Sequence, residues 1–114
     1  LGFSDHKVIQ DKRLREIDYG DFTGLPCSQF KPHMLDYVDK PFPNGESYED
    51  VKRRIMSFLQ EIKREYAGNI AVIAHHAPQL ALDVLLKGRT WEEAITEDWR
   101  TKNAWQPGWD YILE

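Results

Sequence analysis

Two adjacent histidines, His75 and His76, follow the apolar run of residues 70–74. A short β-branched run between a Gly-Asn pair and a proline is typical of a buried strand in a parallel sheet. Ligands bind outside the carboxyl ends of such strands, where the next helix presents free N–H groups. A histidine there is a candidate to bind an anion. Because neighbouring side chains of a strand point to opposite faces, we expect the two histidines to serve different roles rather than to chelate one metal.

A carboxylate, Glu16, lies in a charged, glycine-containing segment, residues 11–24, that is typical of an ordered loop. Its simplest role is a surface ion pair with Arg13 or Arg15, worth about 0–1 kcal/mol. Apolar neighbours on both sides would pin the segment, however. A carboxyl held near a phosphate and partly desolvated can act as a general acid. The sequence therefore leaves two roles open for Glu16, a surface carboxylate or a proton donor.

The elements that must position these residues alternate between strands and helices. We expect strands at residues 7–10, 70–74 and 109–113, helices at 48–66, from near 78 to Gly88 and from Thr90 to about 99, and short helical turns within 26–38. Ser47 and Thr90 are predicted N-caps, each with an acidic residue three positions on. This pattern predicts an α/β fold with a mostly parallel sheet, in a single domain over residues 1–114.

Composition limits the classes of partner. The 114 residues carry 15 basic and 19 acidic side chains, a formal net charge of −4, scattered without a basic stripe. This favours neither a nucleic acid nor a membrane partner, and no apolar run approaches the roughly 18 residues that span a bilayer. The single cysteine, Cys27, allows no intramolecular disulfide and fits a reducing compartment, so we expect a cytoplasmic protein.

Metal and thiol chemistry are weaker alternatives. No histidine pair has the i,i+4 spacing of a helical metal site, so we expect neither a metal nor another cofactor. A hydrolase built on Cys27 with His33 or His75 is remoter still, because the Leu-Pro-Cys-Ser context lacks the local signature of a nucleophile.

Three sequence blocks together resemble the histidine phosphatase superfamily, the phosphoglycerate mutase-like family. They are residues 13–24, which begin Arg13-Leu14-Arg15-Glu16, then residues 43–51, which contain Gly45-Glu46-Ser47, with Arg54 beyond them, then Val72-Ile73-Ala74-His75. The blocks occur in the family's order and span most of the chain. The resemblance implies a three-layer α/β/α fold and phosphoryl transfer through a covalent phosphohistidine, without a metal.

The resemblance also implies roles for individual residues. Glu16 corresponds to the proton donor, His75 to the second, phosphate-binding histidine, and His76 to a neighbour that can touch substrate. Among the basic residues that could steer an anionic substrate, Arg54 is the best candidate because it falls in the Gly-Glu-Ser block. The family's Arg-His-Gly nucleophile segment has no match in this sequence. We therefore expect the C-terminal portion of a longer enzyme, nearly inactive alone, since binding charge and moving protons cannot replace a nucleophile.

The expected function is a phosphatase for a small phosphorylated metabolite. Phosphoglycerate mutase-type phosphotransfer is an alternative, less favoured because nothing in the sequence indicates the extra contacts that retain a bisphosphate. A non-catalytic binding or scaffold relative is another, supported by the absent nucleophile. A missing strand would leave a sheet edge and an apolar face uncovered, so we expect a homo-oligomer, a swapped dimer or association with the missing N-terminal segment.

Overall fold

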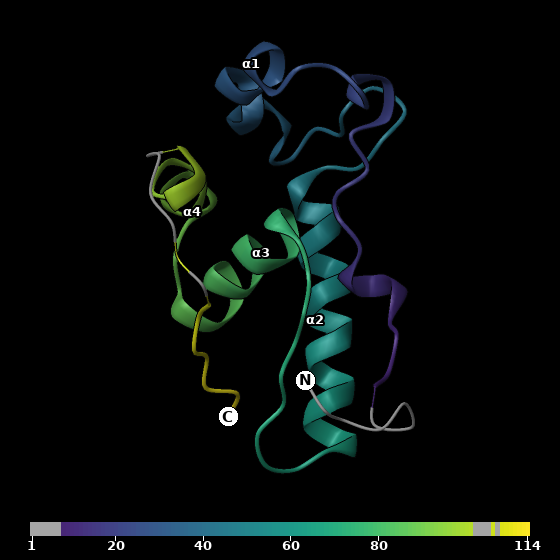
Figure 1. The fold of residues 1–114 in the computed structure, drawn as a ribbon, viewed down its shortest axis with the longest axis vertical. Coiled ribbons are helices and arrows are strands. Elements are labelled where there is room, and N and C mark those ends of the chain that lie inside the picture. The colour runs from purple at the N-terminus through teal and green to yellow at the C-terminus, as the bar shows by residue number, and fades with distance from the viewer. Residues whose placement is uncertain (1–7, 102–105, 107) are drawn as a thin grey trace.

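The computed structural model describes residues 8–101, 106 and 108–114. Its helices are α1 (Cys27–Phe30), α2 (Tyr48–Glu65), α3 (His76–Lys87) and α4 (Trp91–Thr96), with 3-10 turns at Lys12–Leu14, Gly20–Phe22, Lys31–Tyr37 and Trp99–Thr101. Figure 1 shows α2 as the longest element, with α3 beside it and α4 beyond α3. Within the described part of the chain, no helix is both long and apolar enough to cross a membrane.

Helix α2 forms where its caps and apolar spacing predict it. The Ser47 hydroxyl accepts a hydrogen bond from the Asp50 N–H (3.1 Å), and the Asp50 carboxylate accepts one from the Ser47 N–H (2.9 Å). These two bonds satisfy donors that every helix start leaves unpaired. The apolar side of α2 is buried through Val51, Ile55 and Phe58. The prediction of this helix is confirmed, ending at residue 65 rather than 66.

Helices α3 and α4 differ from prediction only at their ends. Helix α3 begins at His76, two residues before Pro78, which lies within the first turn, where its missing N–H costs no helical bond. It ends at Lys87 and is capped by Gly88, whose φ of 66° is the left-handed conformation typical of helix ends. Helix α4 starts at the predicted Thr90 cap, with its capping box to Glu93 present. It stops at residue 96, before a short 3-10 turn.

The predicted α/β fold with a mostly parallel sheet is wrong for the residues described, 8–101, 106 and 108–114, which form helices and turns and include no strand. Residues 8–10, 70–74 and 109–113 have no regular structure, and residue 7 of the first expected strand lies outside the description. A strand needs a neighbour for its N–H and C=O groups, and these segments lack one there. Ile73, expected in a buried strand, is 80% exposed. Residues 69–75 instead form an extended connection from α2 to α3 (Figure 1).

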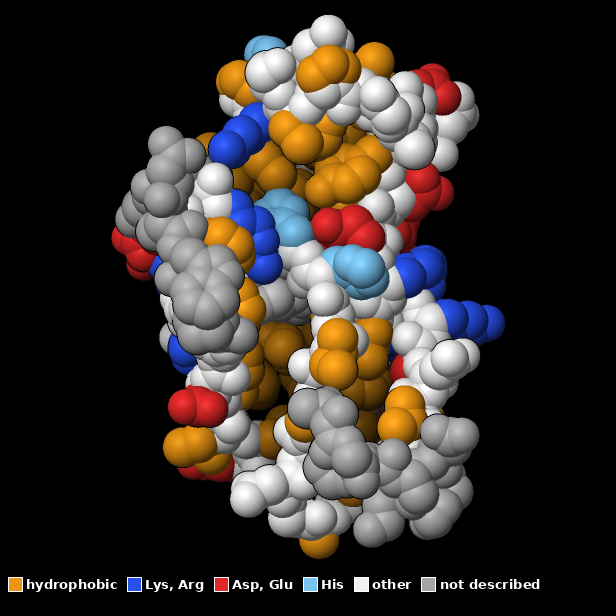
Figure 2. All heavy atoms as spheres, in the orientation of Figure 1, with side chains coloured by type: hydrophobic (Ala, Val, Ile, Leu, Met, Phe, Trp, Pro, Cys, Tyr) orange, Lys and Arg blue, Asp and Glu red, His pale blue; other side chains and the backbone are white. Residues whose placement is uncertain are grey.

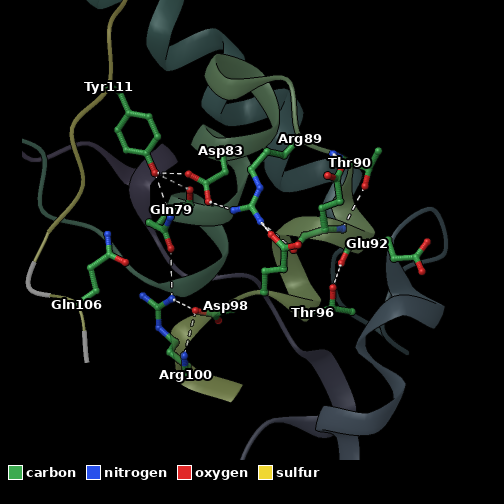
Figure 3. Close-up of polar contacts among 12 residues, drawn as sticks. Gln79, Asp83, Arg89, Thr90, Glu92, Thr96, Asp98, Arg100, Gln106 and Tyr111 are labelled. Atoms are coloured by element: carbon green, nitrogen blue, oxygen red, sulfur yellow. Dashed lines mark hydrogen bonds and ion pairs between the residues drawn. The ribbon is translucent and has the colours of Figure 1, made fainter. Parts of the chain in front are cut away.

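The C-terminal segment is held by polar contacts to α3 rather than by sheet pairing. The Tyr111 hydroxyl donates to the Asp83 carboxylate (2.6 Å) and accepts from the Gln79 side-chain amide (3.0 Å), as Figure 3 shows. The Lys87 ammonium lies 4.8 Å from the centre of the Tyr111 ring. These contacts fix one tyrosine while most of the neighbouring side chains stay exposed.

An aromatic cluster connects the N-terminal loops to the start of α2. Its centre is Phe42, which is fully buried. The rings around it are those of Tyr19, Phe22, Phe30, Tyr37 and Tyr48, at centroid distances of 4.2–6.5 Å. Tilted and edge-on pairs dominate, as ring quadrupoles prefer. The cluster therefore fixes the loop that follows Glu16 against the rest of the molecule.

Two backbone segments approach each other closely at Gly20. The Asp21 N–H donates to the Pro43 carbonyl (2.8 Å), and the Glu46 N–H donates to the Asp18 carbonyl (2.8 Å). Gly20 has a φ of +54°, and a Cβ there would lie 2.0 Å from the Pro43 oxygen. Only glycine fits this position. The loop that carries Glu16 is thereby fastened to the segment that leads into α2.

Candidate active site

The Glu16 carboxylate lies at the N-terminus of α3. Its Oε1 accepts hydrogen bonds from the N–H groups of Ile17 and Ala77, both 2.9 Å long. Ala77 belongs to the first turn of α3, so the carboxylate also meets the positive end of the helix dipole. Ile17 is buried and anchors the backbone beside it. The Glu16 side chain remains 30% exposed and can meet a ligand.

His75 is the N-cap residue of the same helix. Its backbone is extended (φ −126°), its carbonyl accepts from the Gln79 N–H (3.1 Å), and its side chain is exposed. The predicted strand before it is absent, yet the predicted helix N-terminus after it is present. Figure 2 shows histidine and acidic side chains together in the middle of the face it draws, with hydrophobic side chains above and below them. The structure thus brings Glu16 and His75 to the same end of one helix.

His76 turns into different surroundings from its neighbour. Its imidazole is only 14% exposed, with Nε2 3.2 Å from Asp98 Oδ2 and Nδ1 3.9 Å from Glu16 Oε2. Asp98 was not recognised from the sequence, because no motif or spacing connects it with residue 76. Its carboxylate is buried, with 2% exposure. The site therefore contains one exposed and one buried histidine, with acidic groups beside the buried one.

Arg54 fastens the Glu16 loop to α2. Its guanidinium makes two hydrogen bonds to the Glu46 carboxylate (3.0 and 3.1 Å) and three to the backbone carbonyls of Arg13 (2.5 Å), Arg15 (2.9 Å) and Glu16 (3.2 Å). The Arg54 side chain is 10% exposed. Its donors are used within the protein, so Arg54 positions Glu16 rather than steering substrate anions.

Glu46 completes this clamp. Its Oε1 also accepts from the Asp18 N–H (2.9 Å), so one carboxylate holds both the guanidinium and the loop. Burial acts to raise the pKa of Glu46, but the hydrogen bonds from Arg54 and Asp18 outweigh it and hold this pKa below its ordinary value. The Gly-Glu-Ser block places Glu46 and Arg54 eight residues apart, a spacing that could have indicated this pair.

The other candidate chemistries gain no support from the geometry. Within residues 8–101, 106 and 108–114, no three His, Cys, Asp or Glu side chains are grouped so that they could hold a metal ion. Cys27 is an exposed free thiol at the first position of α1. The expectations of no metal, no cofactor and no thiol chemistry remain predictions.

Comparison with known proteins identifies the class. The model of the histidine phosphatase superfamily (branch 1) matches residues 2–105. The match covers nearly the whole chain and includes the Glu16 loop, the Glu46–Arg54 clamp and the N-terminus of α3. This chain therefore belongs to the histidine phosphatase superfamily.

Individual relatives fall into both phosphatase and mutase branches. The chain is 30% identical over 91 residues to phosphoserine phosphatase 1 of Hydrogenobacter thermophilus, covering 72% of this chain and 43% of that protein. It is 30% identical over 112 residues to a 2,3-bisphosphoglycerate-dependent phosphoglycerate mutase of Brucella anthropi (89% and 54%). It is also 38% identical over 64 residues to the fructose-2,6-bisphosphatase TIGAR of Xenopus tropicalis (53% and 23%). The chain spans about half the length of the first relatives that it matches.

Proposed function

We propose that this chain supplies the proton donor and a phosphate-binding histidine to a phosphatase that acts on a small phosphorylated metabolite through a phosphohistidine. The observation that carries the proposal is the Glu16 carboxyl held at the N-terminus of α3, the helix capped by His75. Family membership supports the reaction class. We also propose that the enzyme needs no metal and is cytoplasmic.

The geometry supports Glu16 as a proton donor at one particular oxygen. Oε1 already accepts two backbone N–H groups, so the transferable proton belongs on Oε2. In the transfer step, the bond between phosphorus and the leaving oxygen breaks. Its electron pair stays on that oxygen, which takes the Oε2 proton. The phosphoryl group bonds to a histidine nitrogen outside this chain, and water later cleaves the P–N bond and releases inorganic phosphate.

His75 suits the binding of phosphate oxygens. Its imidazole is exposed next to the first turn of α3, whose N–H groups and dipole favour an anion. Donors fixed before the reaction stabilise the charge that develops on the transferring phosphoryl group. We assign His75 to that role. His76, whose side chain is mostly buried, is at most a neighbour of substrate.

Two alternatives use the same geometry. A phosphoglycerate mutase-type reaction fits the mutases among the relatives, but it requires a site that retains a bisphosphate. A non-catalytic relative fits the lack of an Arg-His-Gly segment in this sequence. The complete open reading frame that encodes this chain discriminates between enzyme and non-catalytic relative, since an Arg-His-Gly segment encoded upstream supports the enzyme.

We also propose that residues 70–74 form a docking edge for another polypeptide segment. Its occupant is the equivalent of the half that the relatives carry and this chain does not cover, an extended apolar segment that pairs with the backbone groups of residues 70–74. The exposure of Ile70, Val72 and Ile73 supports this assignment. In its absence, a second copy of the chain takes the same place.

The experiment uses the protein expressed from the complete open reading frame. Hydrolysis of glycerol 2-phosphate, whose leaving oxygen is basic, is measured for wild type, Glu16→Gln, His75→Ala and the control His33→Ala, whose side chain is exposed beside Asp36. We expect each site variant to lose about 100-fold or more in kcat/KM, since general acids and fixed charge-stabilising donors each contribute about that much. The control should keep wild-type activity. Wild-type rates in Glu16→Gln or in His75→Ala would overturn the assignment.

A further inference from the structure

The His76 imidazole lies between two carboxylates from distant parts of the sequence. Its Nε2 is 3.2 Å from Asp98 Oδ2, a hydrogen-bond distance, and its Nδ1 is 3.9 Å from Glu16 Oε2. Oε2 is the oxygen of Glu16 that the backbone N–H groups leave available. The three side chains therefore form a row, Asp98, His76 and Glu16, that leads from the interior to the site.

Asp98 is fixed from the opposite side. Its Oδ1 accepts hydrogen bonds from the Arg100 guanidinium (2.8 Å) and from the Arg100 N–H (3.3 Å). The same guanidinium donates to the Gln79 side-chain oxygen (3.2 Å), as Figure 3 shows, and lies 4.8 Å from the centre of the Trp99 ring. These contacts hold the carboxylate through Oδ1, and Oδ2 lies against the imidazole.

The charge of Asp98 depends on His76. Burial of the carboxyl acts to raise the pKa of Asp98, but the hydrogen bond from His76, with the donors of Arg100, holds this pKa below its ordinary value. Asp98 is therefore a carboxylate at neutral pH and accepts the Nε2–H of the imidazole. An acceptor on one ring nitrogen fixes which way the other nitrogen faces.

The imidazole also has an aromatic neighbour. The ring of Tyr48, from α2, meets it edge-on at a centroid distance of 6.5 Å. Among the residues that the structure describes, its ion-pair partners are Glu16 from the N-terminal loop and Asp98, with Arg100 behind it, from the segment after α4. The titratable residue next to His76 in its own chain segment is His75, the N-cap residue of α3. Acidic groups on two sides of one ring make its orientation specific.

We propose that Asp98 and His76 are a positioning pair for Glu16. Asp98 orients the imidazole through Nε2–H, and Nδ1 faces the oxygen that carries the transferable proton. At 3.9 Å this contact is too long for a hydrogen bond, so the imidazole orients the carboxyl while the Oε2 proton stays available to the leaving oxygen. The inference rests on the proposed role of Glu16 as proton donor and adds the two residues that hold its reactive oxygen.

The first experiment tests the pair without any activity. Carbon-13 NMR of the aspartate side chains follows the titration of Asp98 in the 114-residue chain, in wild type, His76→Phe and His76→Gln. We expect the phenylalanine to raise the Asp98 midpoint by about one pH unit or more, because burial remains while the donor is lost. Glutamine keeps a neutral donor and should give a smaller rise. The control His33→Phe should leave Asp98 unchanged, and an unchanged midpoint in His76→Phe would overturn the pair.

The second experiment separates positioning from stability. In the protein from the complete open reading frame, Asp98→Asn should lower kcat about tenfold and change its pH profile, with KM within about twofold of wild type. A variant that is merely less stable, with an unchanged kcat profile, would contradict positioning and leave the role of Glu16 intact. If Glu16→Gln itself has wild-type activity, the proposed function fails instead.

Discussion

At the scale of single residues, the site depends on contacts between side chains far apart in the sequence. Glu16 and His75 were candidates from the sequence because each lies in a recognisable block. Asp98 was not, since its contact with His76 spans 22 positions without any periodicity to reveal it. Local spacing can indicate that a carboxylate or histidine is available, but only the folded chain shows what it faces.

The Arg54 clamp gives a test at this scale. Arg54→Ala removes five hydrogen bonds and leaves the Glu46 carboxylate with only the more exposed Arg15, 3.6 Å away, as a cationic partner among the described residues, so we expect the free energy of unfolding to fall by about 2–4 kcal/mol. Arg53→Ala is the matched control, because Arg53 pairs with Asp50 on the exposed side of the same helix. Its effect should stay within about 0.5 kcal/mol. Urea unfolding measures both, and equal losses would contradict the clamp.

At the scale of elements, helices were predictable and strands were not. A helix satisfies its own backbone, so the caps at Ser47 and Thr90 and the apolar spacing of α2 were sufficient. A strand depends on a partner that local sequence does not contain. Residues 70–74 have the composition of a buried strand, yet in the described structure they remain an extended, partly exposed connection.

The loop junction at Gly20 gives a test at the element scale. Gly20→Ala combines the strain of a positive φ (+54°) with a Cβ that would lie 2.0 Å from the Pro43 oxygen. Gly24→Ala is its control, because Gly24 has a φ of +86° with open space around it. We expect Gly24→Ala to lower the free energy of unfolding by about 1–2 kcal/mol through strain alone, and Gly20→Ala to lower it clearly more. Thermal unfolding followed by circular dichroism makes the comparison, and similar losses would show that the close approach does not matter.

At the scale of the whole molecule, an exposed apolar segment lies beside the candidate site. Residues 70–74 lead directly into His75, so whatever covers them also borders the N-terminus of α3. Large apolar side chains exposed together usually mark a contact with another polypeptide. The relatives, about twice as long, have further chain that could provide it. We therefore expect that a segment docked on residues 70–74 also completes the candidate site at the N-terminus of α3.

Self-association of the 114-residue chain tests the docking edge. We expect the mass measured by light scattering to rise above 13.4 kDa with concentration, and Ile73→Lys to reduce that rise by placing a charge on the edge. Leu35→Lys changes an exposed apolar residue of the 3-10 turn Lys31–Tyr37 and should leave the association unchanged. A single 13.4 kDa species at every concentration, with nothing copurifying, would contradict the proposal.

The most direct test of the account is the leaving-group dependence of Glu16→Gln in the protein from the complete open reading frame. A proton donor matters most when the leaving oxygen is basic, so kcat/KM is compared for 4-nitrophenyl phosphate and for an alkyl phosphate such as glycerol 2-phosphate. We predict that the variant loses at least about tenfold more activity on the alkyl phosphate than on the aryl phosphate. An equal loss on both substrates would contradict proton donation by Glu16.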